Sequence, residues 1–219
     1  MSPVPGGEPL RRIVLLRHAE TVDNAARVWQ GHHDSALSER GRRQVAAAAP
    51  HVAAYRPVVI VSSDLQRAVS TAQEVSELTG VPVRLDERLR EVHVGEWQGL
   101  HVDDVHARYP DLVAALDRGE DVRKGVTGET RQDVAARAGA ALREVADGLA
   151  AGETALVVAH GVSARVAASD LLGLDQDLSD RVLHGLDNCH WAELTEAAKS
   201  FSATARWRIS GWNLGSWKT

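Results

Sequence analysis

Cysteine is almost absent from this chain of 219 residues, in which Cys189 is the only one. A lone cysteine excludes an intramolecular disulfide and a cysteine-based zinc site, and such low use suits a reducing compartment. Long apolar runs are also missing, because no stretch approaches the ~20 apolar residues of a membrane span. The start MSPVPGGEPLRR has no apolar run after its basic residues, unlike a signal peptide. We therefore expect a cytoplasmic protein without a membrane partner.

An excess of positive charge is lacking as well. The chain has 25 Lys and Arg against 30 Asp and Glu, a net charge of −5, so nothing indicates nucleic acid or an anionic membrane as a partner. No composition break, repeat or low-complexity linker divides the chain, and its length suits one α/β domain. We predict a single domain over residues 1–219, with residues 1–10 loose. Any anion site must then be local, built from a few side chains.

Short apolar, β-branched runs alternate with longer segments of helical spacing. The runs are too short for helices and too continuously apolar for half-exposed strands, which is typical of buried parallel strands. The expected strands lie at residues 13–16, 58–61, 81–85 and 155–159. This alternation predicts an α/β fold, a three-layer sandwich whose mostly parallel central sheet carries helices on both faces.

The segments between these strands carry helix start and stop signals. Ser38 precedes one helical segment as its cap, and Ser63 with Gln66 three residues later has the spacing of a capping box. That second helix is expected to stop at Gly80. Further helices are expected within residues 129–152 and 160–173, each with a glycine stop.

The remaining segments are less regular. Residues 190–199 and 202–213 look like two strands that pair as a hairpin or form an edge. We expect the tryptophans at 207, 212 and 217 to pack there and seal the sheet. The segment 95–128 is the least regular part of the chain, and we predict that it forms a cap over any site at the strand ends.

Histidine and arginine follow three of the predicted strands. Ligands of an open parallel sheet bind beyond the carboxyl ends of its strands. Arg17-His18 ends the first strand, His160-Gly161 ends the fourth, and Arg67 lies in the first helical turn after the second. A cation opposes the dipole at a helix start, and an anion bound to the guanidinium and to free N–H groups would offset this. Each residue alone is more often structural, but at one shared edge they predict a phosphate site.

Several separated motifs occur in an order that resembles one family. These are LLRHAET followed by Asn24, then WQG, LSERGRRQ, SSDLQRA, LREVHVGEWQGL, GET and VVAHG. Together they are similar to the histidine phosphatase superfamily, which includes the cofactor-dependent phosphoglycerate mutases, and they span roughly residues 13–195. The resemblance implies the phosphoglycerate mutase-like form of the sandwich. Within the family, the layout and the tail RWRISGWN look most similar to phosphatases that act on a sugar phosphoglycerate.

The resemblance implies a role for each residue at the strand ends. His18 would be the nucleophile and form a phosphohistidine, kept neutral by nearby positive charge, with a backbone carbonyl or a carboxylate fixing its tautomer. Glu91 would protonate the leaving alkoxide and then activate the attacking water. The implied catalytic residues are His18, Glu91, Arg17, Arg67 and His160, of which the last three would also stabilise transition-state charge. The implied substrate-binding residues are Arg17, Asn24, Gln30, Gly31, Arg67, His160 and Gly161.

The sequence departs from the family pattern in small ways. Ala19 stands where the family usually has glycine, which we interpret as a slightly tighter pocket, and Thr130 replaces a more usual serine but keeps the hydroxyl. The histidines at 32, 33, 93, 101 and 106 lack the carboxylate-supported spacing of a zinc helix. Because the family chemistry needs no metal, we predict neither a metal nor a cofactor.

Several functions are compatible with a phosphate site. The resemblance favours a metal-independent phosphatase of a small-molecule phosphomonoester, and a sugar phosphoglycerate is one candidate substrate. Phosphoglycerate mutases carry a long insertion after the catalytic glutamate, whereas only 38 positions separate Glu91 from Glu129. A non-catalytic phospho-ligand sensor would have no need of His18, Glu91 and His160 together. A phosphoprotein phosphatase needs a shallow site, which the expected cap disfavours. A homodimer is compatible with the resemblance.

Overall fold

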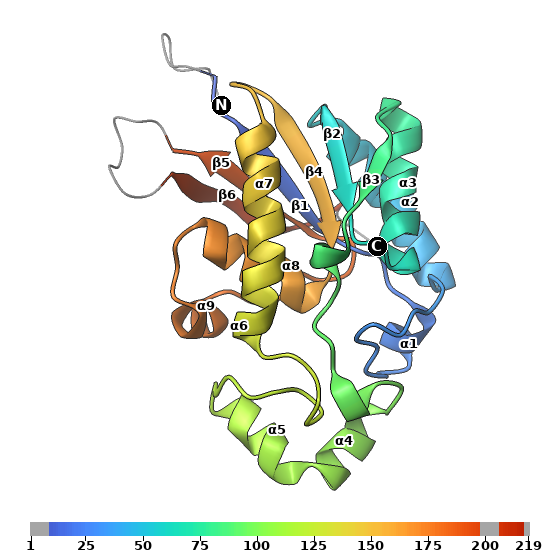
Figure 1. Cartoon of the computed structure of the whole chain (residues 1–219). Helices are drawn as coiled ribbons and strands as arrows, with labels where there is room; N and C mark the ends of the chain where they lie inside the picture. The colour runs from blue at the N-terminus through green and yellow to red at the C-terminus, as the bar shows by residue number, and fades with distance from the viewer. Residues whose placement is uncertain (1–8, 198–205, 217–219) are drawn as a thin grey trace.

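The computed structural model describes residues 9–197 and 206–216. Within these ranges, strands and helices alternate along most of the chain (Figure 1). The strands are β1 (Arg12–Arg17), β2 (Val59–Ser62), β3 (Val83–Leu85), β4 (Thr154–Ala159), β5 (Trp191–Glu196) and β6 (Trp207–Leu214). The helices are α1 (Val22–Ala25), α2 (Glu39–Ala53), α3 (Gln66–Thr79), η1 (Glu87–Leu89), η2 (Gly95–Trp97), α4 (Val102–Arg108), α5 (Pro110–Asp117), α6 (Arg131–Val134), η3 (Ala135–Gly139), α7 (Ala140–Gly148), α8 (Gly161–Leu171) and α9 (Gln176–Val182).

The strands form one mixed sheet in the order β3-β2-β4-β1-β5-β6. The pairs β1–β4, β2–β4 and β2–β3 are parallel, whereas β5 runs antiparallel to both β1 and β6. The register places Arg17 opposite Ala159 and Ser62 opposite Val158, so three strands end together at one edge. The predicted α/β fold with a mostly parallel sheet is therefore confirmed.

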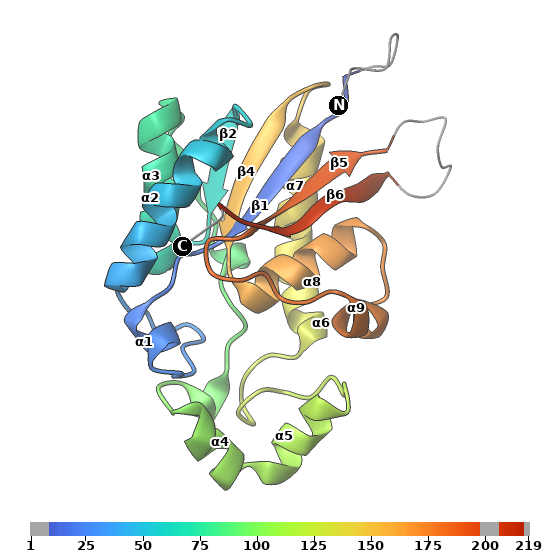
Figure 2. The ribbon, with the colours of Figure 1, turned by 180° about the vertical axis from the view of Figure 1, so that it is seen from behind.

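Helices cover both faces of this sheet. Along β1, Ile13 and Leu15 belong to one core cluster with α7 and α8, and Val14 and Leu16 belong to another with α2 and α3. This split follows from the alternation of side chains across a strand. Helix α7 lies in front of the sheet in Figure 1, and α2 lies in front of it in the reverse view of Figure 2. The three-layer arrangement predicted from the sequence is thus present.

Burial of the strands follows their place in the sheet. Strand β4 has a neighbour on each side and is buried along its whole length. Strand β3 lies at the edge, begins at Val83, and leaves Leu85 53% exposed. The prediction of a buried strand over residues 81–85 is therefore wrong, because an edge strand is not covered on both faces as a central strand is.

Two of the predicted helix signals, the Ser38 cap and the Gly80 stop, are confirmed, and the one at Ser63 is wrong. The hydroxyl of Ser38 accepts from the Gly41 N–H at 2.9 Å and caps α2 as predicted. The capping box expected at Ser63 is wrong, because α3 begins at Gln66 and its cap residue Leu65 makes no side-chain hydrogen bond. The helix does end at a glycine, Gly80, whose φ of +73° is the left-handed conformation that glycine adopts freely.

The long helical run just before β4 contains an irregular turn. Segments α6, η3 and α7 follow one another without a break, and η3 is a π-helical turn of five residues. A π-helical turn inserts an extra residue into the α-helical repeat, and such turns are frequent at functional sites. This turn carries Arg137.

The last two strands form the hairpin that was one of the two expectations. Strand β6 pairs antiparallel with β5 at the edge of the sheet. Trp207 is buried in the core cluster, and Trp212 packs against the same cluster while its indole N–H donates to the His184 carbonyl at 2.9 Å. Trp217 and most of the segment 1–10 that was expected to be loose lie outside the described residues.

The segment 95–128 lies beyond the carboxyl ends of the parallel strands. Both views place α4 and α5 there, away from the sheet (Figures 1 and 2). Buried Trp97 anchors the segment, with its ring 5.2 Å from that of Trp29 and 6.0 Å from that of Tyr109. None of the helices in the described ranges is both long enough and apolar enough to cross a membrane.

Candidate active site

A cavity of about 270 Å³ lies where β1 ends. Side chains from α1 and its following loop, the start of α3, the segment after η1 and the first turn of α8 form its wall. Its lining residues are Arg17, His18, Asn24, Arg27, Val28, Trp29, Gln30, Gly31, Arg67, Glu91, Val92, Val94, Val102 and Val162. Seven of the nine residues predicted for the site are among them, and the other two, His160 and Gly161, lie beside it.

His18 is buried at the end of β1 with a defined ring orientation. Its Nδ1 lies 2.7 Å from the Ala19 carbonyl, so this nitrogen carries the proton and Nε2 keeps its lone pair. Burial is the largest cause that lowers the pKa of His18 well below the ordinary value, followed by the charges of Arg67 and Arg17. Nearby charge was the expected cause of a neutral imidazole, but desolvation lowers the pKa more.

His160 lies next to His18. The two ring centroids are 5.0 Å apart, and the Nε2 of His160 is 2.8 Å from the hydroxyl of Ser63 at the end of β2. Burial, followed by the charge of Arg67, lowers the pKa of His160 well below its usual value. Its buried Nδ1 has no hydrogen-bond partner among the described residues. His160 is thus next to the expected nucleophile but is not part of the cavity wall.

Gly161 lies next to Arg17. A Cβ atom at this position would lie 3.5 Å from the Arg17 guanidinium carbon, an ordinary van der Waals distance. The close approach of a ligand to this glycine stays a prediction. The next residue, Val162, lines the cavity.

Two guanidinium groups face the cavity, that of buried Arg67 and that of half-buried Arg17. Arg17 donates to the Leu186 carbonyl at 2.6 Å, and Arg67 donates to the carbonyl oxygens of Gly31 at 2.7 Å and His33 at 2.9 Å. The Nε of each has no partner among the described residues. Burial is the main cause that lowers the pKa of both groups, although the Glu91 carboxylate acts in the opposite direction. Such desolvated cations favour the binding of an anion.

Asp34 changes the expectation about the start of α3. Its carboxylate accepts from the backbone N–H groups of Gln66 and Arg67, and it pairs with the Arg67 guanidinium at 3.2 Å. A residue from another segment therefore offsets the cation at the helix start and occupies the free N–H groups. The prediction that a bound anion would use those N–H groups is wrong.

The amides of Asn24 and Gln30 are oriented by their oxygen atoms. Asn24 Oδ1 accepts from the Thr21 backbone N–H and from the Asn188 amide, each at 3.2 Å. Gln30 Oε1 accepts from the hydroxyls of Thr21 and Ser35, each at 3.1 Å. Because both oxygens are occupied, the NH₂ groups remain as donors for a ligand.

Gly31 shapes the opposite wall. Its φ of +56° is a conformation that side-chain-bearing residues rarely adopt, and a Cβ here would lie 2.7 Å from the Val94 side chain. Its carbonyl accepts from Arg67, so the glycine allows the loop to come close to that guanidinium.

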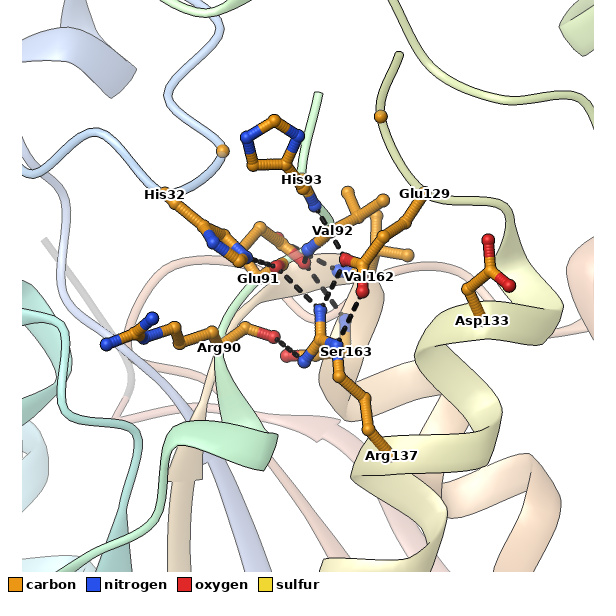
Figure 3. A network of polar contacts seen from close by, with 12 residues as sticks. His32, Arg90, Glu91, Val92, His93, Glu129, Asp133, Arg137, Val162 and Ser163 are labelled. Carbon is orange, nitrogen blue, oxygen red and sulfur yellow. Dashed lines mark hydrogen bonds and ion pairs between the residues drawn. The ribbon is translucent and has the colours of Figure 1, made fainter. Parts of the chain in front are cut away.

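Glu91 reaches the cavity from the extended segment after η1. Its carboxylate accepts from the N–H of Val92 at 2.9 Å, and from two N–H groups of the first turn of α8, Val162 at 3.1 Å and Ser163 at 3.0 Å (Figure 3). A carboxylate at a helix N-terminus interacts favourably with the helix dipole. Glu91 thus occupies these two N–H groups of α8, as Asp34 does at α3.

Sequence reasoning missed four residues of this region. Ser63 was interpreted as a helix cap but contacts His160, and Asp34 drew no attention because its partners lie 32 positions away. Arg27 lies between two motif residues, Asn24 and Gln30, and that position was the available signal. Arg137 had no local signal at all.

Comparison with known proteins gives the family. The model of the histidine phosphatase superfamily (branch 1) matches residues 13–210. A glucosyl-3-phosphoglycerate phosphatase from Mycolicibacterium vanbaalenii is 39% identical over 216 residues, covering 93% of this chain and 95% of that protein. A probable phosphoglycerate mutase from Erwinia tasmaniensis is 31% identical over 201 residues, covering 92% and 89%. The chain belongs to the histidine phosphatase superfamily.

A solved structure extends the likeness to three dimensions. The structure of a mycobacterial glucosyl-3-phosphoglycerate phosphatase complexed with VO₃ superimposes with a TM-score of 0.83 at 38% identity. The match covers 93% of this chain and 98% of that one. The predictions of a histidine phosphatase and of a phosphoglycerate mutase-like fold are confirmed.

Proposed function

We propose that this protein hydrolyses the phosphomonoester of a sugar phosphoglycerate without a metal, through a phosphohistidine at Nε2 of His18. One observation carries this proposal. A neutral imidazole, its Nδ1 proton held by the Ala19 carbonyl, stands in a cavity with two guanidinium groups, half-buried Arg17 and buried Arg67. A neutral nucleophile beside fixed positive charge suits attack on a phosphoryl group.

The first step transfers the phosphoryl group to the enzyme. The Nε2 lone pair of His18 forms a bond to phosphorus while the bond from phosphorus to the ester oxygen breaks. Glu91 gives its proton to the departing alkoxide and becomes a carboxylate, which the N–H groups of Val162 and Ser163 then stabilise.

The second step releases inorganic phosphate. A water molecule takes the place of the alcohol, and Glu91 accepts its proton as the oxygen attacks phosphorus. The bond from phosphorus to Nε2 breaks and the lone pair returns to His18, so proton and charge balance over the cycle. Glu91 is acid in the first step and base in the second.

The remaining predicted residues bind the phosphoryl oxygens. Arg17 and Arg67 supply fixed positive charge in place of solvating water. They stabilise the additional negative charge of the transition state. The NH₂ groups of Asn24 and Gln30 donate neutral hydrogen bonds. We assign His160, whose Nδ1 lacks a partner among the described residues, to a phosphoryl oxygen, and the backbone of Gly31 and Gly161 to the approach of the group.

The rest of the cavity suits a small acid larger than phosphate. A third arginine, Arg27, lines it, and the remaining wall is largely apolar, with Trp29, Val94 and Val102 among its residues. A phosphoglycerate carries a carboxylate in addition to its phosphate, which Arg27 can pair with. Val102 belongs to segment 95–128, so this segment serves as the cap within one domain that spans the chain. The relative from Mycolicibacterium vanbaalenii is named for a substrate of this kind.

The second candidate is a phosphoglycerate mutase. It is supported by the relative from Erwinia tasmaniensis, named a probable phosphoglycerate mutase. A mutase would return the phosphoryl group to the same carbon skeleton instead of passing it to water. The same site residues would serve both reactions, so only the products distinguish them.

The test is a panel of phosphomonoesters assayed with a chelator present. For the wild type we expect phosphate release, fastest with a sugar phosphoglycerate, and acid-labile label on His18 from a radioactive ester. His18→Ala should lose turnover by several orders of magnitude because, among the described residues, the cavity lining contains no other neutral nucleophile. Full activity in that variant, or activity that returns only with added metal, would contradict the mechanism.

The same assay separates the two candidates. Interconversion of 2- and 3-phosphoglycerate that is faster than phosphate release would select the mutase. A cytoplasmic location stays a prediction from the single cysteine, and a homodimer stays a prediction from the resemblance.

A further inference from the structure

Arg137 contacts the backbone that carries Glu91. It projects from the π-helical turn η3 toward the extended segment after η1 (Figure 3). Its Nη1 donates to the carbonyl oxygens of Arg88 at 2.8 Å and Arg90 at 2.6 Å, and its Nη2 donates to the carbonyl of Glu91 at 2.8 Å. One guanidinium thus holds three carbonyl groups around a single residue.

Glu129 holds the other side of the same segment. Its carboxylate accepts from Arg137 at 2.8 Å (Nε) and 2.7 Å (Nη2), and from the His93 backbone N–H at 2.8 Å. The Glu129 backbone N–H in turn donates to the His93 carbonyl at 2.8 Å. Burial raises the pKa of Glu129, but the hydrogen bonds from Arg137 and the His93 N–H, together with the charge of Arg137, outweigh this and leave the pKa lowered, so the pair is ionic.

The segment needs such support because it has no regular structure. Residues 90–94 belong to no helix or strand, so their backbone groups lack the partners that a sheet or helix provides. His32 adds one more contact, with its Nε2 2.8 Å from the Glu91 carbonyl. The hydrogen bonds of Arg137 and Glu129 therefore fix the Cα position from which the Glu91 carboxylate reaches the first turn of α8.

The π-helical turn explains why a residue of the long helix can do this. An extra residue in the turn shifts the phase of the side chains relative to a continuous α-helix. On either side of η3, Val134 and Leu142 point into the core, while Arg137 points to the loop. The turn thus lets one helix serve the core and the site together.

We propose that Arg137, neutralised by Glu129, is a positioning residue for Glu91, and that it sets how well Glu91 protonates the leaving group. This inference rests on the proposed role of Glu91 as the acid. A group displaced by about 1 Å loses on the order of 100-fold in rate. The contact is made through the backbone, and Arg137 is not among the residues that line the cavity.

Comparing two leaving groups tests the proposal. Glycerol phosphate leaves as an alkoxide that needs a proton, whereas p-nitrophenyl phosphate leaves as a stable anion that does not. For Arg137→Met we expect kcat/KM for glycerol phosphate to fall about 10- to 100-fold more than kcat/KM for p-nitrophenyl phosphate. A loss of folded protein reduces both values equally, so the ratio responds only to the acid.

The matched controls define each outcome. Arg143→Met removes an arginine of the same helical run that pairs with Asp170, and it should leave the ratio unchanged. Arg137→Lys should restore part of the ratio, because an ammonium can reach some of the carbonyls. Glu129→Gln keeps the shape of the side chain but removes the counter-charge, and it should shift the ratio in the same direction. It serves as the test variant if Arg137→Met does not fold.

Two results would overturn different claims. Equal losses for both esters in Arg137→Met, or in Glu129→Gln where that variant substitutes for it, would overturn the positioning role. If Glu91→Gln lowers kcat/KM for glycerol phosphate and for p-nitrophenyl phosphate by the same factor, the proposed role of Glu91 as the acid would instead be overturned.

Discussion

At the scale of single residues, the arginines of the cavity differ in how firmly they are held. Arg67 is 1% exposed and bound to two carbonyls and a carboxylate, so its guanidinium is fixed before any ligand arrives. Arg27 instead pairs with Asp103 at 3.4 Å in a contact where both side chains are more than half exposed. Exposed pairs of this kind contribute little free energy, so Arg27 can exchange Asp103 for a substrate carboxylate at small cost.

The residue-scale prediction concerns Arg27. Arg27→Met should raise KM for a phosphoglycerate ester about 10-fold or more, because a charge-assisted hydrogen bond to the carboxylate is lost. KM for glycerol phosphate, which has no carboxylate, should stay within about 2-fold of the wild type. Steady-state kinetics on both esters measure this.

The control for that prediction is Asp103→Asn, which releases Arg27 without removing it. This variant should bind the phosphoglycerate ester at least as tightly as the wild type. Equal increases in KM for both esters in Arg27→Met would show that Arg27 acts on the shape of the site and not on a carboxylate.

At the scale of elements, two helices point their N-termini toward the site, and the N–H groups of each donate to a carboxylate of the protein itself. Asp34 occupies the start of α3, and Glu91 occupies the start of α8. In the proposed mechanism, phosphate recognition is therefore left to guanidinium, imidazole and amide groups, in contrast to folds in which a helix N-terminus holds the phosphate. The arrangement also places Glu91 at the cavity, where N–H donors already stabilise its carboxylate form.

The element-scale prediction concerns Asp34. Asp34→Ala should lower the free energy of unfolding by roughly 1 kcal/mol, since the first N–H groups of α3 lose their acceptor. Asp34→Asn keeps an acceptor oxygen and should retain most of this stability. Urea denaturation of the two variants gives the comparison, and equal stability in both would contradict a capping role.

The same pair of variants reports on Arg67. Both remove the negative charge that faces its guanidinium at 3.2 Å. Inorganic phosphate, measured as a competitive inhibitor, should therefore bind more tightly to both than to the wild type.

At the scale of the whole molecule, the sheet brings the site together and buries it. Strands β1, β2 and β4 end at one edge, which gathers His18, Ser63 and His160 from positions that are far apart in the chain. The two histidines are almost completely buried, with His18 3% and His160 0% exposed. Two neutral imidazoles in the interior make folding sensitive to acid.

The whole-molecule prediction is a loss of stability in weak acid. The unfolded chain takes up protons on these histidines below about pH 6.5, whereas the folded chain does not until a much lower pH, because burial depresses both pKa values. Stability is therefore complete above about pH 6.5 and falls as the pH is lowered toward the folded-state pKa. Each histidine adds a slope of at most about 1.4 kcal/mol per pH unit.

Urea denaturation between about pH 5 and 8 measures this dependence. His160→Asn should remove its own part of the slope, and His51→Asn, a variant at the exposed end of α2, should leave the slope unchanged. A free energy of unfolding that is constant over this range in the wild type would contradict the prediction.

The sequence by itself determined the alternation of strands and helices, the Ser38 cap, the glycine stop at Gly80 and the residues at the strand ends. These depend on short-range physics, namely the period of apolar side chains and the dihedral preferences of single residues. The shared edge also followed, because parallel strands must end on the same side. Arg17, His18 and Arg67 line one cavity for that reason, whereas Asn24, Gln30, Gly31 and Glu91, which line it too, were implied by the family resemblance.

Only the tertiary structure decided which polar group pairs with which. The hydrogen-bonded partners are far apart in the sequence. Asp34 and Gln66 are 32 positions apart, and Glu91 and Ser163 are 72 positions apart. Arg137 and Glu91 are 46 positions apart. Several donors and acceptors are chemically equivalent in the sequence, and the choice among them depends on distances that appear only when the layers pack. The same reason explains why the edge position of β3, and with it the exposure of Leu85, could not be read from its apolar run.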